Sequence, residues 1–133
     1  MNSKKDIFKN IGIFLLTLIF SSCQTISSLH SGGGGTIFIV KYKKYSEVWK
    51  SANHVVSQQL TIISAEKDLG VIKAEKGAGL FTWGEVVGVF ISPTEESSPI
   101  YTVKVQSLKR STYQITGQNW ESTIVQGMKS ELE

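Results

Sequence analysis

The sequence has a single cysteine and only two histidines among its 133 residues. One cysteine excludes an intramolecular disulfide and a cysteine-rich metal site. His30 and His54 fall in separate segments, so they do not readily build a catalytic triad, and the chain contains no G-x-S-x-G or H-E-x-x-H motif. We therefore expect no enzymatic activity, no cofactor and no metal.

The sequence also lacks an excess of one charge. Three lysines and one aspartate in residues 1–22 account for most of the formal net charge of +3, so the rest of the chain is nearly neutral. A nucleic-acid-binding domain would carry a concentrated basic face, and we expect no nucleic acid partner. Hydrophobic residues make up 41% of the chain and charged residues 19%, a balance that favours a folded domain over disorder.

The apolar run at residues 11–20 (IGIFLLTLIF) is too short to favour a membrane-spanning helix. As a helix it would measure about 15 Å, half of the roughly 30 Å hydrocarbon core of a bilayer. Lysines precede the run, and the small residues Ser21 and Ser22 follow it, directly before Cys23. This order is typical of a secretory signal peptide over residues 1–22.

Residues 20–23 (FSSC) resemble the bacterial lipobox, with Phe20 in place of the usual leucine. The resemblance implies lipidation of Cys23 and cleavage before it, and two or three acyl chains anchor a protein stably. Gln24 replaces the aspartate that commonly retains enterobacterial lipoproteins in the inner membrane. We therefore predict a lipid-anchored cell-envelope protein, at the outer membrane and facing the periplasm. The alternative is an ordinary signal peptide followed by an unpaired cysteine.

Removal of residues 1–22 would leave 111 residues, enough for one domain. After Cys23, residues 24–35 (QTISSLHSGGGG) are rich in serine and glycine and have no apolar period. We predict that residues 23–35 form the lipidated cysteine and a flexible tether, with His30 in solvent. Residues 36–133 are then a single α+β domain.

Several segments of this domain have the composition or alternation of strands. They are residues 36–42, 60–66, 71–76, 84–92 and 100–107. The sequence Lys67-Asp68-Leu69-Gly70 predicts a tight hairpin between the second and third segments. Gly88 predicts either a bulge or a large ring packed over the strand.

Two segments have the apolar period of a helix, one starting at a Ser46 cap and running to about Gln59, the other from about Asn119 to Leu132. Trp49 and Trp120 lie on the apolar arcs, so we expect both to be buried. The predicted fold is a two-layer α+β domain, with an antiparallel meander sheet of 4–5 strands and both amphipathic helices on one face.

The glycine-rich segment 77–84 (GAGLFTWG) lacks the Lys-Ser/Thr and the following helix of a phosphate-binding loop. We expect Leu80, Phe81 and Trp83 to fold back against the open end of the sheet. If they are exposed instead, they would mark a contact with a partner or a membrane. Basic residues such as Lys109 and Arg110 flank strands, where they would protect sheet edges or favour anionic headgroups.

The order of motifs in residues 45–133 resembles small bacterial lipoproteins of a domain-of-unknown-function family. The motifs are YSEVW at 45–49, KDLGVI at 67–72, WGEVVGVFISP at 83–93, YTVKVQS at 101–107 and NW at 119–120. The layout is also similar to the helix-grip domains of the lipoprotein in the outer-membrane β-barrel assembly machine. The resemblance implies a fold and a location, and it lends no activity.

Together these features predict a non-enzymatic binding or accessory module, held on the membrane by lipid on Cys23 and contacting another envelope protein. The alternative hypothesis is a carrier or sensor of an apolar ligand, held between helices and sheet. A filled core would favour the first hypothesis, and a pocket of several hundred Å³ the second. The sequence does not indicate the oligomeric state.

Overall fold

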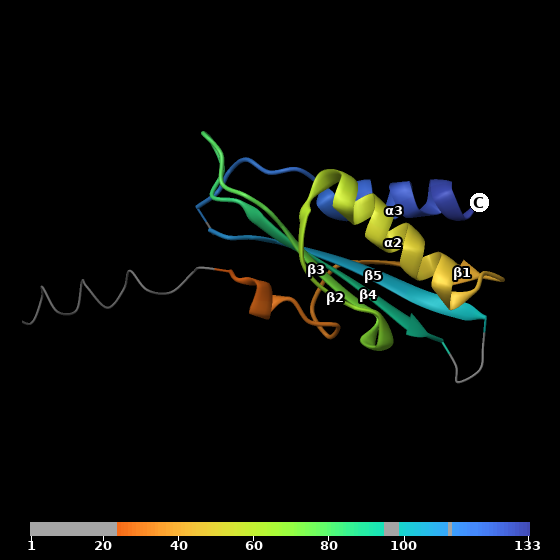
Figure 1. The fold of residues 1–133 in the computed structure, drawn as a ribbon. Coiled ribbons are helices and arrows are strands. Elements are labelled where there is room, and N and C mark those ends of the chain that lie inside the picture. The colour runs from red at the N-terminus through yellow and green to blue at the C-terminus, as the bar shows by residue number, and fades with distance from the viewer. Residues whose placement is uncertain (1–23, 95–98, 112) are drawn as a thin grey trace, which may run out of the picture.

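Five antiparallel strands form one sheet, and two helices cover one of its faces (Figure 1). The computed structural model describes residues 24–94, 99–111 and 113–133. The strands are β1 (Thr36–Lys41), β2 (Thr61–Glu66), β3 (Val71–Lys76), β4 (Glu85–Pro93) and β5 (Ile100–Lys109). The helices are α2 (Tyr45–Gln59) and α3 (Trp120–Leu132), and the 3-10 turns are η1 (Ile26–Ser28) and η2 (Lys67–Leu69). The predicted two-layer α+β fold is confirmed.

The strand order is β1-β5-β4-β3-β2, so β2 to β5 form a meander and β1 pairs with β5 at the far edge. Helix α2 carries the chain across the sheet from β1 at one edge to β2 at the other. The central strand β4 is buried on both faces over most of its length. Because consecutive strands of the meander are antiparallel, the connections between them alternate between the two ends of the sheet.

Apolar side chains of the two helices and of one sheet face form the main core. Val48, Val56 and Ile124 are completely buried, as the helical period predicts. The helices approach closely at Gly127, where a Cβ would lie 2.7 Å from a methyl carbon of Val55. Trp120 is buried, but the expectation for Trp49 is wrong, because this ring is only partly covered.

Local signals in the sequence explain most element ends. Asn119 caps α3, accepting a hydrogen bond from the Ser122 N–H at 3.0 Å. Gly70 ends the hairpin turn with φ 67°, the left-handed conformation that favours glycine. The start of α2 differs from the prediction. Its cap is Lys44 rather than Ser46, and the Lys44 N–H donates to the Glu47 carboxylate at 2.7 Å.

The ring of Phe90 lies over Gly88 on the sheet face opposite the helices. A Cβ on Gly88 would come within 2.8 Å of this ring, so only glycine fits beneath it. The β4–β5 register runs without interruption through Gly88, which excludes the predicted alternative of a bulge there. Phe90, Val86 and Leu29 form a second, smaller core on this face.

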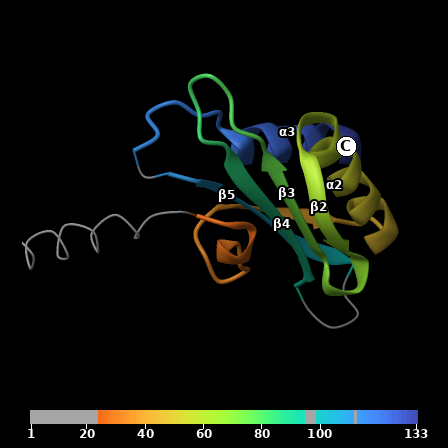
Figure 2. The same ribbon diagram turned by 60° about the vertical axis from the view of Figure 1, so that its left-hand side comes forward.

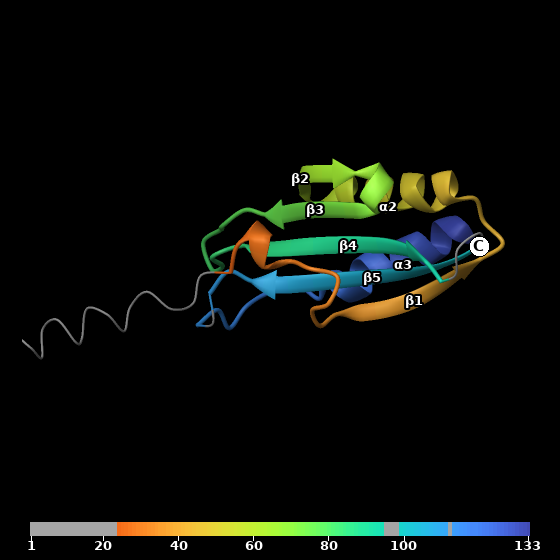
Figure 3. The ribbon, with the colours of Figure 1, turned by 90° about the horizontal axis from the view of Figure 1, so that it is seen from below.

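Leu29 belongs to the segment predicted as a flexible tether, and that prediction is wrong for residues 24–35. Leu29 is only 1% exposed, and the His30 N–H donates to the Gln106 side chain at 3.1 Å. Lys104 donates to the Ser31 carbonyl at 2.8 Å. Seen from below, the segment crosses β4 and β5 (Figure 3). A few apolar and backbone contacts, without any periodic pattern, fix this segment, and the His30 side chain remains exposed as expected.

Candidate functional site

Two loops at one end of the sheet expose five large hydrophobic side chains. Loop 77–84 joins β3 to β4, and loop 110–119 joins β5 to α3 (Figures 1 and 2). We call the exposed group the apolar tip. Its members, which are between 70% and 96% exposed, are Leu80, Phe81, Trp83, Tyr113 and Ile115. The expected burial of the first three is therefore wrong.

The space against the open end of the sheet is occupied by other groups. Trp120, at the start of α3, is 3% exposed and donates its indole N–H to the carboxylate of Glu85. Glu85 is itself buried at the start of β4, and Gly117 packs directly on its carboxylate. These residues cover the main core at this end, so that part of the core is not open to the side chains of loop 77–84.

The apex of loop 77–84 is a small hairpin. Gly79 N–H donates to the Thr82 carbonyl at 2.9 Å, and a second, longer bond of 3.4 Å returns from Thr82 to Gly79. Leu80 and Phe81 therefore occupy the two positions between the paired residues. Exposed turns usually carry Gly, Asn, Asp, Pro or Ser, which suit both water and the backbone. Large apolar residues at the apex satisfy neither requirement.

Hydrogen bonds clasp the two loops to each other. The Trp83 N–H donates to the side-chain oxygen of Gln114 at 3.2 Å, and the Thr116 hydroxyl donates to the Phe81 carbonyl. At the base, the Arg110 N–H donates to the Gly84 carbonyl at 3.2 Å. Gln114 is buried between the loops. The apolar tip is consequently one composite surface rather than two independent loops.

The tip carries no charge, and cations surround its base. Neither residues 77–84 nor residues 111–119 include a charged residue. Lys76 directly precedes the first loop, and Lys109 and Arg110 precede the uncharged part of the second. Arg110 forms an ion pair with Glu75, and the Lys109 ammonium donates to the Gln114 carbonyl at 3.5 Å. The apolar tip is therefore uncharged, and Lys76, Lys109 and Arg110 lie where its two loops begin.

The chain enters the described part of the molecule at this same end. The N–H of Gln24 donates to the Arg110 carbonyl at 3.1 Å, which places Gln24 beside the base of the apolar tip. Cys23, the predicted lipidation site, directly precedes Gln24 and lies outside the described residues, as do residues 1–22. Among the helices that the structure describes, none is long and apolar enough to span a bilayer.

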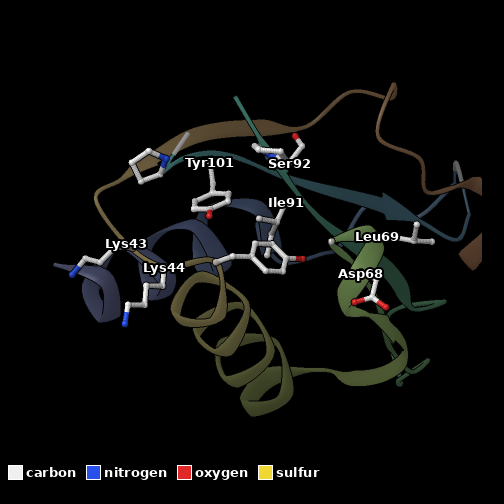
Figure 4. A pocket seen from close by; sticks show the side chains of 11 residues that line it. Lys43, Lys44, Asp68, Leu69, Ile91, Ser92 and Tyr101 are labelled. Carbon is white, nitrogen blue, oxygen red and sulfur yellow. The ribbon is translucent and has the colours of Figure 1, made fainter. Parts of the chain in front are cut away.

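A second candidate is an open hollow of about 700 Å³ at the opposite end of the sheet (Figure 4). Tyr45 and Tyr101 lie in it with ring centroids 5.6 Å apart. Burial and the nearby charge of Asp68 raise the pKa of Tyr45, whose hydroxyl donates to the Lys67 carbonyl. In Figure 4 Asp68 lies on the side of the hollow opposite Lys43 and Lys44, so the charges do not converge on one ligand position.

This hollow does not have the position that the carrier hypothesis requires. An apolar ligand between helices and sheet would need space in the main core, and the described core residues there pack on one another. The hollow instead opens at the surface, beside the helix start and the η2 turn. A smaller hollow of about 330 Å³ between β1 and α3 is also open at the surface.

His54, which we did not expect to form a catalytic triad, lies on α2 and contacts Glu131 on α3. Its Nδ1 lies 2.5 Å from a carboxylate oxygen of Glu131, and its Nε2 lies 3.1 Å from the Gln58 amide. Both ring nitrogens are thus engaged within the protein, and the ring is on the surface. Within the described ranges no three His, Cys, Asp or Glu side chains gather as a metal site would require.

The pKa of Glu131 reflects this pair. Burial alone would raise it, but the hydrogen bond from His54 and the charges of His54 and Lys50 outweigh that effect. The carboxyl therefore has a pKa below its ordinary value. The pair is a surface contact between α2 and α3, and it lies in an open hollow of about 540 Å³ whose lining also includes Lys50.

Sequence reasoning identified the first three residues of the apolar tip and missed Tyr113 and Ile115. Residues 108–118 have the composition of a short polar connection. Tyr113 and Ile115 are isolated apolar residues within it and fit neither a helix period nor a strand alternation. The absence of charge could have indicated Tyr113 and Ile115. Both loops are uncharged, each follows lysine or arginine, and they lie at the same end of neighbouring strands.

A scan against protein-family models finds no matching family, and a search of curated proteins finds no similar sequence. The resemblance to small lipoproteins and to helix-grip domains therefore stays a prediction.

Proposed function

We propose that this protein is a lipid-anchored lipoprotein of the cell envelope and acts as a non-enzymatic binding or accessory module. Its contact surface is the apolar tip. The observation that carries the proposal is the exposure of five large hydrophobic side chains on two loops that hydrogen bonds hold together. Such patches on a soluble domain mark sites of recognition.

The size of the tip is adequate for a useful contact. Full burial of one large apolar side chain contributes about 1.5–3 kcal/mol. Burial of Leu80, Phe81 and Trp83 together would therefore contribute several kcal/mol before the cost of association is subtracted. Tryptophan and tyrosine are also the residues that most often dominate binding energies. Because the loops are clasped, little additional ordering is required when they bind.

The anchor supports the same function. Lipid on Cys23 would hold the protein at the membrane, and Gln24 lies beside the base of the tip. An anchored protein meets its partner at a high effective concentration, so a contact of moderate strength is sufficient. The mass of the mature N-terminus tests the anchor directly: acyl groups on Cys23 are expected, and an unmodified cysteine would contradict this half of the proposal.

The contact surface is tested by site-specific photocrosslinking in intact envelopes. A photoreactive phenylalanine analogue replaces Phe81 in one variant and Tyr42 in the control. Tyr42 is equally exposed, at 85%, but lies on the connection between β1 and α2 at the other end of the sheet. We expect adducts with a lipid or a protein from position 81 and few from position 42. Equal yields from both positions would remove the tip as the contact surface.

A further inference from the structure

We infer that the component bound by the apolar tip is the surface of the lipid bilayer that holds the Cys23 anchor. This inference rests on the proposed function, because it names the partner of the same surface. A lipidated protein on a long flexible tether could face any direction. The packed segment 24–35 changes that expectation, since it fixes where the chain leaves the domain.

The exit point and the tip lie at one end of the molecule. Figures 1 and 3 show loops 77–84 and 110–119 at the same end as the start of the described chain. Gln24 is hydrogen-bonded to Arg110, the residue that begins the second loop. With the anchor one residue beyond Gln24, little chain separates the bilayer from the base of the tip. The membrane is therefore the first extended apolar surface within reach of Phe81 and Trp83.

The chemistry of the tip suits the bilayer interface. Neither loop carries a charge between its basic residues and the following element, so insertion of the apex would require no buried ion. Tryptophan and tyrosine prefer the interface, where the ring enters the apolar layer and the polar atom stays near water. The hydrogen bonds between Gly79 and Thr82 pair backbone groups of the apex within the loop, which reduces the cost of leaving water.

The cations at the base add electrostatic complementarity. Lys76, Lys109 and Arg110 lie next to the uncharged loops, at the level where headgroups would contact an inserted tip. Basic residues near an anionic leaflet each contribute about 1 kcal/mol of attraction. Arg110 is paired with Glu75 at the base of the tip, so the attraction to headgroups rests on Lys76 and Lys109.

The test uses the intrinsic fluorescence of the full chain, purified from membranes and reconstituted in vesicles of phosphatidylethanolamine and phosphatidylglycerol. The chain has three tryptophans: Trp83 on the tip, Trp120 in the core, and Trp49 near the start of α2. Acyl chains brominated near the headgroup quench only rings that enter the bilayer. We expect quenching in the wild type and in Trp49→Phe, and its loss in Trp83→Phe. Both replacements are conservative and remove one reporter each.

Phe81→Ser, with Tyr42→Ser as the matched control, extends the test to the insertion itself. Loss of the second apolar ring should reduce the quenching of Trp83 severalfold, whereas Tyr42→Ser should leave it unchanged. Absence of quenching, or quenching that persists in Trp83→Phe, would overturn the membrane inference. If a photoreactive group at Phe81 then captures a protein in envelopes, the binding module stands and only its partner changes. If neither lipid nor protein contacts position 81, both proposals fail.

Discussion

The two connections at either end of β3 have opposite chemistry. The turn before β3 contains Lys67, Asp68 and a left-handed Gly70, which suit an exposed turn, and one exposed apolar residue, Leu69. The loop after β3 places Leu80 and Phe81 at its apex. Both connections join neighbouring antiparallel strands of one meander, so folding requires each of them to reverse the direction of the chain. Loop 77–84 thus departs further from turn chemistry than the turn before β3 does, as expected if binding rather than stability shaped it, which is what we propose.

The largest expected difference in stability is between substitutions of two tryptophans. Trp120 is buried in the main core, and Trp83 is 70% exposed on the apolar tip. Trp120→Ala should lower the free energy of unfolding by about 3–5 kcal/mol, whereas Trp83→Ala should change it by about 0.5 kcal/mol or less. Urea denaturation of both variants measures the difference. Similar losses would mean that the tip belongs to the core and is not a free surface.

The next prediction concerns the other face of the sheet. Leu29 is buried against Val86 and Phe90, so Leu29→Ala should cost about 2–5 kcal/mol. His30→Ala is the matched control, because its side chain is exposed and only its backbone N–H binds Gln106. The control should remain within about 0.5 kcal/mol of the wild type. If Leu29→Ala is equally neutral, residues 24–35 are a tether and the fixed exit of the chain is lost.

Glycine substitutions sharpen the contrast between the two connections themselves. Gly70 has φ 67°, and a Cβ there would lie 2.0 Å from the Ile91 carbonyl oxygen. Gly77 has no positive φ, and a Cβ there would meet no side chain or backbone of the described residues within 4 Å. Gly70→Ala should therefore destabilise the protein by about 2 kcal/mol or more, and Gly77→Ala should be nearly neutral. Thermal denaturation checks both, and a large loss for Gly77→Ala would show that loop 77–84 is also constrained by folding.

The sequence predicted what depends on periodic or local signals. The helix periods placed Val48 and Ile124 in the core, and Asn119 and Gly70 identified an element start and a turn. The order of the strands also followed from consecutive hairpins, except that nothing local indicates the pairing of β1 with β5. That pairing depends on where α2 returns the chain, which is a property of the assembled layers.

The errors in the prediction have the same physical origin. Leu29 is one apolar residue in a polar segment, and its burial depends on the space that Gly88 leaves beside Phe90, far away in the sequence. The exposure of Leu80 depends on Trp120 having already closed the core. In both cases the outcome is decided by competition for a distant apolar surface. Composition of the segment alone does not contain that information.

The smallest expected effect is at the contact between helices α2 and α3. Glu131→Gln removes the carboxylate that faces His54, and surface pairs of this kind contribute about 1 kcal/mol or less. Because the pKa of Glu131 is lowered in the folded protein, its contribution is present above the ordinary carboxyl pKa of 4.5 and is lost as the pH falls through the lowered value. The difference in unfolding free energy between wild type and variant should therefore shrink toward zero in acid.

Denaturant titrations at about pH 7 and about pH 3 measure this change, with Glu133→Gln as the control. Glu133 is exposed at the end of the same helix, so its replacement should have little effect at either pH. Added salt should also reduce the Glu131 effect, because exposed charges are screened. A Glu131→Gln variant that is more stable than the wild type at about pH 7 would mean that the carboxylate destabilises the helix pair, and His54 would then need another role.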